Sequence, residues 1–244
     1  MSDIVAFTTI KQGGITDWVH RNRSVIFLDT AKALVREKIP CVVTYIDCEQ
    51  EYVDQLTNIG MNMIKQTFSA HLGEVRRKAL SEVLKMYPST KYFFWLEPEK
   101  PDMPHYATEL ASVMDKEQSI LGLFNRMNMD QYPPEQAHYY LLCRAAASEL
   151  LGIDIDYSFG PMMFTQTGAK YFLDYRGSYG DMWDAILIPR LKIIKAKQPF
   201  SILPIPFMND QRMYQLEVGK PNFILKRLEQ LNNIIPSLIA ELGS

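Results

Sequence analysis

Residues 91–100 read Lys-Tyr-Phe-Phe-Trp-Leu-Glu-Pro-Glu-Lys, and they join an apolar run of strand length to two carboxylates. Five consecutive apolar or aromatic residues after a Pro-Ser-Thr turn predict a strand that is covered on both faces of a sheet. In open α/β sheets, ligands bind at the carboxyl ends of such strands. We therefore expect Glu97 and Glu99, which follow the run, to mark the functional edge of a sheet.

Pro98 lies between the two carboxylates. It fixes one backbone angle and lacks an N–H donor, so the pair should occupy a stiff segment that cannot continue a central strand. Two hard oxygen ligands suit Mg²⁺ or Mn²⁺, which take one or two protein carboxylates and leave other positions to phosphate oxygens and water. The same residues also fit a polar strand end that faces solvent.

Strands and helices alternate along the first half of the chain. Apolar runs predict strands at residues 4–9, 41–46, 61–65 and 92–96, and apolar residues at helical spacing predict helices at residues 17–38, 51–59 and 73–86. This alternation favours a mostly parallel sheet with helices on both faces. The fold class we expect is α/β, with a mostly parallel central sheet flanked by helices.

The second half, residues 120–244, has a less regular pattern. It predicts strands at 120–127 and 202–207 and helices at 135–151, 167–175 and 223–242, and a loop at 152–159 leads into residues 160–164. Residues 185–196 form a further amphipathic segment that Pro189 should interrupt. Pro204 and Pro206 should confine their strand to an edge of the sheet. No linker separates the halves, so we expect one domain over residues 1–244, with 1–119 and 120–244 as its two parts.

Composition and motifs exclude several classes of protein. The 244 residues carry a formal net charge of −2 with dispersed basic residues, which disfavours general nucleic-acid binding. No run is long and apolar enough for a membrane span, and we expect no signal peptide. The three cysteines are not clustered, which favours a reducing, cytoplasmic location. Zinc-type histidine spacing, a phosphate loop and a dinucleotide fingerprint are all missing from the sequence.

The order of elements resembles the GT-A nucleotide-diphospho-sugar glycosyltransferases, in particular those of family 2. The resemblance covers most of the chain and is carried by the first strand, the acidic end of the second strand at Asp47, and the segments 73–80, 95–99, 160–161 and 180–184. It implies a GT-A-like single domain that transfers a sugar from a nucleotide-diphospho-sugar to an acceptor hydroxyl. The family's Asp-any-Asp motif binds a metal ion; here Glu97-Pro98-Glu99 stands in its place, so the resemblance implies Mn²⁺ or Mg²⁺ as cofactor.

The resemblance and the residue chemistry together predict four groups of site residues. The nucleotide-sugar should contact Thr8, Asp47, Arg76, Glu97 and Lys100; the metal should be held by Glu97, Glu99 and Asp210; the catalytic carboxylates should be Asp181 and Asp184; and the acceptor should lie against Gly160 and Trp183. Each of these residues also has a plain structural interpretation: Asp47 as a helix cap, Arg76 as a solvated basic residue, Trp183 as a core anchor, and Gly160 as a turn residue before Pro161.

Two other functions stay open at the level of sequence. A nucleotidyltransferase that makes an activated sugar would use a similar sheet and acidic pair, although the first loop lacks the glycines and lysines expected of it. The protein could also bind a nucleotide sugar or a protein without catalysis. In that case the change from Asp to Glu in the motif would reflect the loss of a metal site. The donor's base and sugar, the acceptor and the stereochemical outcome are not predicted. The apolar residues Leu228, Leu231 and Ile235 of the last helix allow either packing on their own domain or a homo-oligomer.

Overall fold

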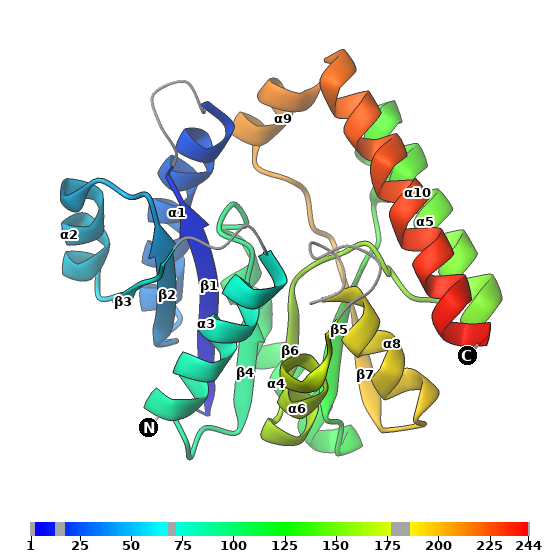
Figure 1. Ribbon diagram of the computed structural model, residues 1–244, viewed down its shortest axis with the longest axis horizontal. Coiled ribbons are helices and arrows are strands. Elements are labelled where there is room, and N and C mark those ends of the chain that lie inside the picture. The colour runs from blue at the N-terminus through cyan, green and yellow to red at the C-terminus, as the bar shows by residue number, and fades with distance from the viewer. Residues whose placement is uncertain (1–2, 13–17, 68–71, 177–185, 244) are drawn as a thin grey trace.

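A computed structural model describes residues 3–12, 18–67, 72–176 and 186–243, and these residues form a central sheet with helices on both faces (Figure 1). Its strands are β1 (Ile4–Lys11), β2 (Cys41–Ile46), β3 (Asn62–Lys65), β4 (Tyr92–Trp95), β5 (Leu121–Arg126), β6 (Met162–Phe164) and β7 (Phe200–Ile205). They belong to one seven-stranded sheet in the order β3-β2-β1-β4-β6-β5-β7. Both halves of the chain therefore contribute strands to the same sheet.

The sheet is mostly parallel, as the sequence predicts. β1 pairs in parallel with β2 and β4, β2 with β3, and β5 with β7. β6 is antiparallel to both of its neighbours, β4 and β5. The prediction that the proline-containing strand lies at an edge is confirmed, because β7 is the last strand on its side.

Helices cover both faces of this sheet. They are α1 (Trp18–Arg36), α2 (Gln50–Ile59), α3 (Leu72–Met86), α4 (Ala107–Glu117), α5 (Pro134–Leu151), α6 (Gln166–Asp174), α8 (Leu187–Lys195), α9 (Gln211–Glu217) and α10 (Pro221–Gly243), with short 3-10 turns η1 (Met103–Tyr106) and η2 (Met129–Gln131). Helices α5 and α10 lie side by side on one flank (Figure 1). None of the helices in these described ranges is long and apolar enough to cross a membrane.

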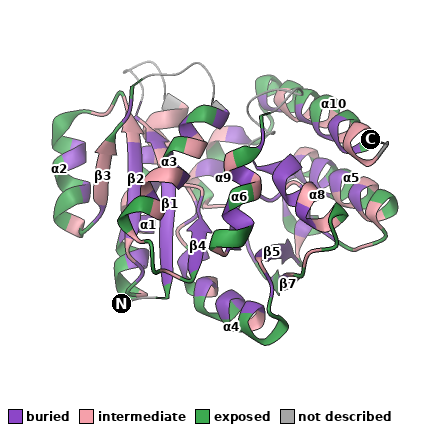
Figure 2. Cartoon of the chain, turned by 60° about the horizontal axis from the view of Figure 1, so that its bottom comes forward, coloured by how far each residue is buried: buried purple, intermediate pink, exposed green. Residues whose placement is uncertain are grey.

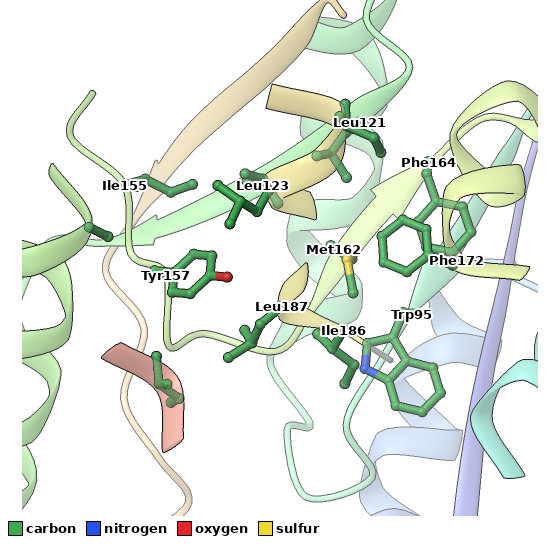
Figure 3. Close-up of a cluster of buried hydrophobic side chains, with 14 of the residues drawn as sticks. Trp95, Leu121, Leu123, Ile155, Tyr157, Met162, Phe164, Phe172, Ile186 and Leu187 are labelled. Atoms are coloured by element: carbon green, nitrogen blue, oxygen red, sulfur yellow. The ribbon is translucent and has the colours of Figure 1, made fainter. Parts of the chain in front are cut away.

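Alternate residues of the strands point into two hydrophobic cores. On β1, Val5 and Phe7 pack with α3, whereas Ala6 packs with α1 and α4. Figure 2 shows the central strands buried between helices whose outer surfaces are exposed. Figure 3 shows part of the first core, where Ile186 lies beside Trp95 and below Met162. Burial on both faces explains why these strands are uniformly apolar.

Two expectations about the helices need correction. The sequence pattern leaves residues 107–117 unassigned, but they form α4, whose buried residues Leu110 and Met114 cover the sheet. Pro189 does not interrupt its segment, because α8 begins at Leu187 and the proline lies in the first turn, where no intrahelical N–H bond is lost. Most other boundaries agree with the predicted ones within two residues.

Candidate functional site

The carboxyl ends of the parallel strands meet at one edge of the sheet, which we call the carboxyl edge; the opposite edge is the amino edge. The strands that end there are β1 at Lys11, β2 at Ile46, β3 at Lys65, β4 at Trp95, β5 at Arg126 and β7 at Ile205. Antiparallel β6 begins at this edge, directly after Gly160 and Pro161. The topology therefore brings the segments after β4 and β7 and the loop before β6 to the same place.

The segment after β4 is held by backbone atoms on two sides. The N–H of Leu96 donates to the carbonyl of Phe7 on β1 at 3.2 Å. The hydroxyl of Thr30 on α1 donates to the carbonyl of Pro98 at 2.7 Å. Because β1 and α1 both fix this turn, Glu97 and Lys100 have defined positions at the carboxyl edge.

Lys100 is the central cation of this edge. Its side chain is only 9% exposed, and its Nζ lies 3.2 Å from Oε2 of Glu97 and 3.4 Å from Oδ1 of Asn209. The rings of Phe159 and Phe207 each lie 5.0 Å from Nζ, close enough for cation–π attraction. We call Glu97, Lys100, Phe159, Phe207 and Asn209 the Lys100 cluster.

Opposing effects act on the pKa of Lys100. Burial lowers it, but the negative charges of Glu97 and Glu99 more than offset burial, so the pKa of Lys100 lies above its usual value. For Glu99, burial raises the pKa, and Arg23 together with Lys100 lowers it to below its usual value. Both groups are therefore charged at neutral pH.

Gly160 lies against the carboxylate of Glu97. A Cβ placed on Gly160 would be 2.5 Å from Oε1 and 2.7 Å from Cδ of Glu97. A Cβ at this position would therefore require the Glu97 carboxylate to shift from the place where it pairs with Lys100. The structure thus brings together the predicted residues Glu97, Lys100 and Gly160, and the close approach that glycine permits is made by a side chain of the protein itself.

A buried ion pair holds the loop that leads to Gly160. Nε of Arg126 donates to Asp156 at 2.6 Å, and a second guanidinium nitrogen donates to the same carboxylate at 3.0 Å. Both side chains are at most 1% exposed. The guanidinium lies 3.7 Å from the ring centre of Tyr140 and 4.6 Å from that of Phe159. Phe159 thus connects this ion pair with the Lys100 cluster.

The sequence pattern alone does not identify Arg126 or Asp156 as site residues. A signal for Arg126 was present, because it ends an apolar strand, the pattern that drew attention to Glu97. No signal could pair it with Asp156, 30 residues away, because that contact depends on the path of the chain from β5 through α5 to β6.

Arg190 on α8 is a second buried cation near the same loop. Its guanidinium donates to the carbonyls of Tyr157 and Phe159, both at 2.7 Å, and the residue is 1% exposed. Burial lowers the pKa of Arg190 to about 10, although Tyr157, Asp156 and Glu97 partly offset this effect. Among the described residues it forms no ion pair, so its positive charge adds to the field behind Gly160.

Each carboxylate predicted as a metal ligand faces a cation of the protein. The pairs are Lys100–Glu97 at 3.2 Å, Arg23–Glu99 at 3.1 Å and Arg212–Asp210 at 2.7 Å. Asp210 also caps α9 by accepting from the backbone N–H of Arg212 at 2.8 Å. Within the described ranges, no three or more His, Cys, Asp or Glu side chains gather where they could hold a metal ion. Because each of these three carboxylates already pairs with a cation of the protein, a bound Mn²⁺ or Mg²⁺ would have to displace at least one of those cations.

The other predicted contacts are more scattered. Thr8 is buried in β1, and its hydroxyl has no hydrogen-bond partner among the described residues. Asp47 is exposed, has a φ of 49° and does not cap α2, whose N-cap is Glu49. Arg76 lies 5.6 Å from the ring centre of Trp95 and lines a small pocket together with Phe7 and Ile186. The predicted catalytic and acceptor residues Asp181, Trp183 and Asp184 lie outside the described residues.

The fold is that of GT-A-like nucleotide-diphospho-sugar transferases. No protein-family model and no curated protein matches the sequence. Solved structures that match its fold include the following three. Glucosyl-3-phosphoglycerate synthase from Mycobacterium tuberculosis, in complex with Mn²⁺, UDP-glucose and phosphoglyceric acid, is 14% identical with a TM-score of 0.57, covering 98% of this chain and 77% of that chain. Mannosyl-3-phosphoglycerate synthase from Rubrobacter xylanophilus is 12% identical with a TM-score of 0.52, covering 94% and 75%. CMP:2-keto-3-deoxy-manno-octonic acid synthetase, complexed with CTP, is 10% identical with a TM-score of 0.56, covering 93% and 100%.

Proposed function

We propose that this protein is a glycosyltransferase that moves a sugar from a nucleotide-diphospho-sugar to an acceptor hydroxyl. The observation that carries the proposal is the buried Lys100 cluster at the carboxyl edge of a GT-A-like sheet. Ligands of open α/β sheets bind at this edge. A fixed ammonium group there suits a ligand with a diphosphate.

The chemistry requires stabilisation of a leaving group. The bond between the anomeric carbon and the diphosphate oxygen breaks, and its electron pair stays on the nucleoside diphosphate, whose negative charge increases. The acceptor oxygen forms the new bond to carbon and loses its proton to a base. Lys100 is placed to stabilise the leaving charge, and Arg76 at the start of α3 is a second cation for the same role. That Asp181 or Asp184 accepts the proton stays a prediction from sequence.

The ligands of a structurally similar protein suggest which donor and acceptor classes to test first. The mycobacterial enzyme was captured with UDP-glucose and phosphoglyceric acid. We infer that the donor is a nucleoside diphosphate carrying a hexose, and that an acceptor with an anionic group is the first to test. The free cysteines Cys41, Cys48 and Cys143 agree with the predicted cytoplasmic location, and the homo-oligomer stays a prediction.

A nucleotidyltransferase is the second candidate, because the CTP-complexed synthetase has the same fold over all of its chain. Such an enzyme would join a nucleoside triphosphate to a sugar and release pyrophosphate. A glycosyltransferase would instead release a nucleoside diphosphate from a nucleotide sugar. The two products are distinct and can be measured in the same sample.

Phosphorus NMR of the purified protein tests the proposal. UDP-, GDP-, ADP- and CDP-sugars are incubated with the protein and a panel of hydroxyl acceptors that includes phosphoglyceric acid, and nucleoside triphosphates are incubated with free sugars in parallel. Release of one nucleoside diphosphate that depends on an acceptor supports glycosyl transfer. Pyrophosphate release supports the second candidate. Binding of a nucleotide sugar with no product under any condition would contradict both and favour a noncatalytic binding protein.

A further inference from the structure

We propose that Lys100 supplies the fixed positive charge at the diphosphate site, so that nucleotide binding by this protein requires no divalent cation. This inference rests on the proposed function. It also explains why Glu97-Pro98-Glu99 differs from the metal-binding motif that the resemblance implies.

The carboxylates near β4 are already neutralised. Glu97 pairs with Lys100 at 3.2 Å, and Glu99 pairs with Arg23 at 3.1 Å. A dication bound between them would lie within a few ångströms of a buried ammonium group, and charges of the same sign repel strongly in a poorly solvated site. A metal ion would therefore have to displace at least one of these cations.

The ammonium group of Lys100 also keeps a hydrogen-bond donor for a ligand. Its ammonium has three N–H donors, and the structure gives it two polar neighbours, Glu97 and Asn209. One donor is thus left without an acceptor among the described residues. The rings of Phe159 and Phe207, which contact each other with centroids 5.3 Å apart, each lie 5.0 Å from the ammonium and favour its charge. A phosphate oxygen at the carboxyl edge is a suitable acceptor for the third donor.

The surrounding charges favour an anion over a second cation. Arg190 lies behind the same loop, donates only to backbone carbonyls and forms no ion pair among the described residues. Lys226 on α10 lies close enough to Glu99 and Arg23 for their charges to influence it. A diphosphate would meet this field with favourable electrostatics without any added metal.

Gly160 makes room for the ion pair between Glu97 and Lys100. Its lack of a Cβ lets the Glu97 carboxylate sit against the backbone where it pairs with Lys100. Glu97 therefore acts as a positioning residue for the ammonium. Lys100 itself is the residue that we expect to contact phosphate.

Isothermal titration calorimetry with UDP, GDP, ADP and CDP, each in EDTA and each in Mn²⁺, tests the inference on the full chain. We expect one nucleoside diphosphate to bind with dissociation constants that agree within about threefold between the two conditions. Lys100→Met should weaken binding by about 10- to 100-fold in both conditions, because a charge-assisted hydrogen bond is lost. Lys100→Arg, which keeps the cation, should retain more of the affinity.

Lys91→Met is the matched control. Lys91 also pairs with a carboxylate, that of Asp115, but at the other end of β4, and its removal should leave the affinity unchanged. If Lys100→Met fails to fold, the wild-type comparison still decides. Binding that appears only with Mn²⁺ would overturn the inference and leave the proposed function standing. No binding of any nucleotide in either condition would overturn both.

Discussion

The lysine–carboxylate pairs at the two edges of the sheet differ in how far they are exposed to solvent. At the amino edge, the pair Lys91–Asp115 is about half exposed, with side-chain exposures of 55% and 49%. At the carboxyl edge, in the segment after β4, the pair Lys100–Glu97 has exposures of 9% and 32%, and the ammonium lies 5.0 Å from each of two aromatic rings. A lysine–carboxylate pair thus lies near each end of β4, exposed at the amino end and largely buried at the carboxyl end.

This difference indicates where the function lies. A lysine–carboxylate pair in water contributes little to stability, and its loss is readily tolerated. A buried charge costs free energy unless the protein pairs and hydrogen-bonds it, and such groups cluster at functional sites. The carboxyl edge holds three buried cations, Lys100, Arg126 and Arg190. The contrast between the edges can be tested by breaking each in turn.

The largest effect is expected for Arg126→Met. The substitution leaves the fully buried Asp156 without its partner, so we expect a loss of about 3–5 kcal/mol in the free energy of unfolding. Urea denaturation followed by circular dichroism measures it. The double variant Arg126→Met/Asp156→Leu should recover much of the loss, since both charges are then removed. A single-variant loss below about 1 kcal/mol would show that the pair is not buried as described.

Gly160→Ala is expected to act mainly on nucleotide binding. The new methyl group must displace the Glu97 carboxylate from Lys100, and because this carboxylate ends a flexible side chain that is 32% exposed, the cost in stability should stay below about 1 kcal/mol. Nucleoside diphosphate affinity should fall more than stability. Shortening the partner, in Gly160→Ala/Glu97→Asp, should relieve the clash, and a double-mutant cycle measures the coupling. Additive effects of the two substitutions would argue against the contact.

Thr30→Val tests whether α1 holds the segment after β4. The variant keeps the side-chain shape and removes the hydrogen bond to the carbonyl of Pro98, at an expected cost of about 1 kcal/mol. Thr57→Val is a matched control, because the Thr57 hydroxyl bonds only to a carbonyl of its own helix. Thermal denaturation compares them. An equal loss of stability in both variants would mean that the hydrogen bond from Thr30 to Pro98 stabilises the protein no more than a bond within a helix does.

The smallest effect is expected for Lys91→Met at the amino edge, where solvent replaces the lost partner. Its main consequence should be on the pH dependence of stability. Hydrogen bonds from Lys91 and Tyr92 hold the pKa of Asp115 below its usual value. That contribution is present above the ordinary aspartate pKa and is lost as the pH falls through the lowered folded-state pKa. The free energy of unfolding of the variant should therefore fall less at acid pH than that of the wild type. The same pH dependence of stability in both proteins would contradict this.

Much of the fold could be predicted, because period and composition identify buried strands and amphipathic helices. The apolar runs of β1, β2 and β4 and the proline-bearing edge strand β7 fall where the sequence placed them. The direction of β6 could not be read, because three apolar residues fit either orientation. Helix α4 was missed in the proline-containing region after Lys100.

The site was predictable only in part. Glu97, Lys100 and Gly160 were identified and do lie together, because strand ends and glycines mark the carboxyl edge of such a sheet. Their environment was not predictable, since Phe159 and Phe207 reach Lys100 from segments far along the chain. The ion pairs of Glu99 and Asp210 were not predictable either. Arg23 reaches Glu99 from a distant part of the sequence, and the pairing of Arg212 with Asp210 depends on side-chain geometry.

Hydrogen–deuterium exchange with and without a saturating nucleotide-diphospho-sugar tests most directly whether the carboxyl edge is the binding site. Peptides that cover residues 96–103 and 206–210 should gain protection, whereas those covering residues 88–91 and 115–120 at the amino edge should exchange at the same rate. Protection confined to the amino edge, or no protection by any UDP-, GDP-, ADP- or CDP-sugar, would contradict the account.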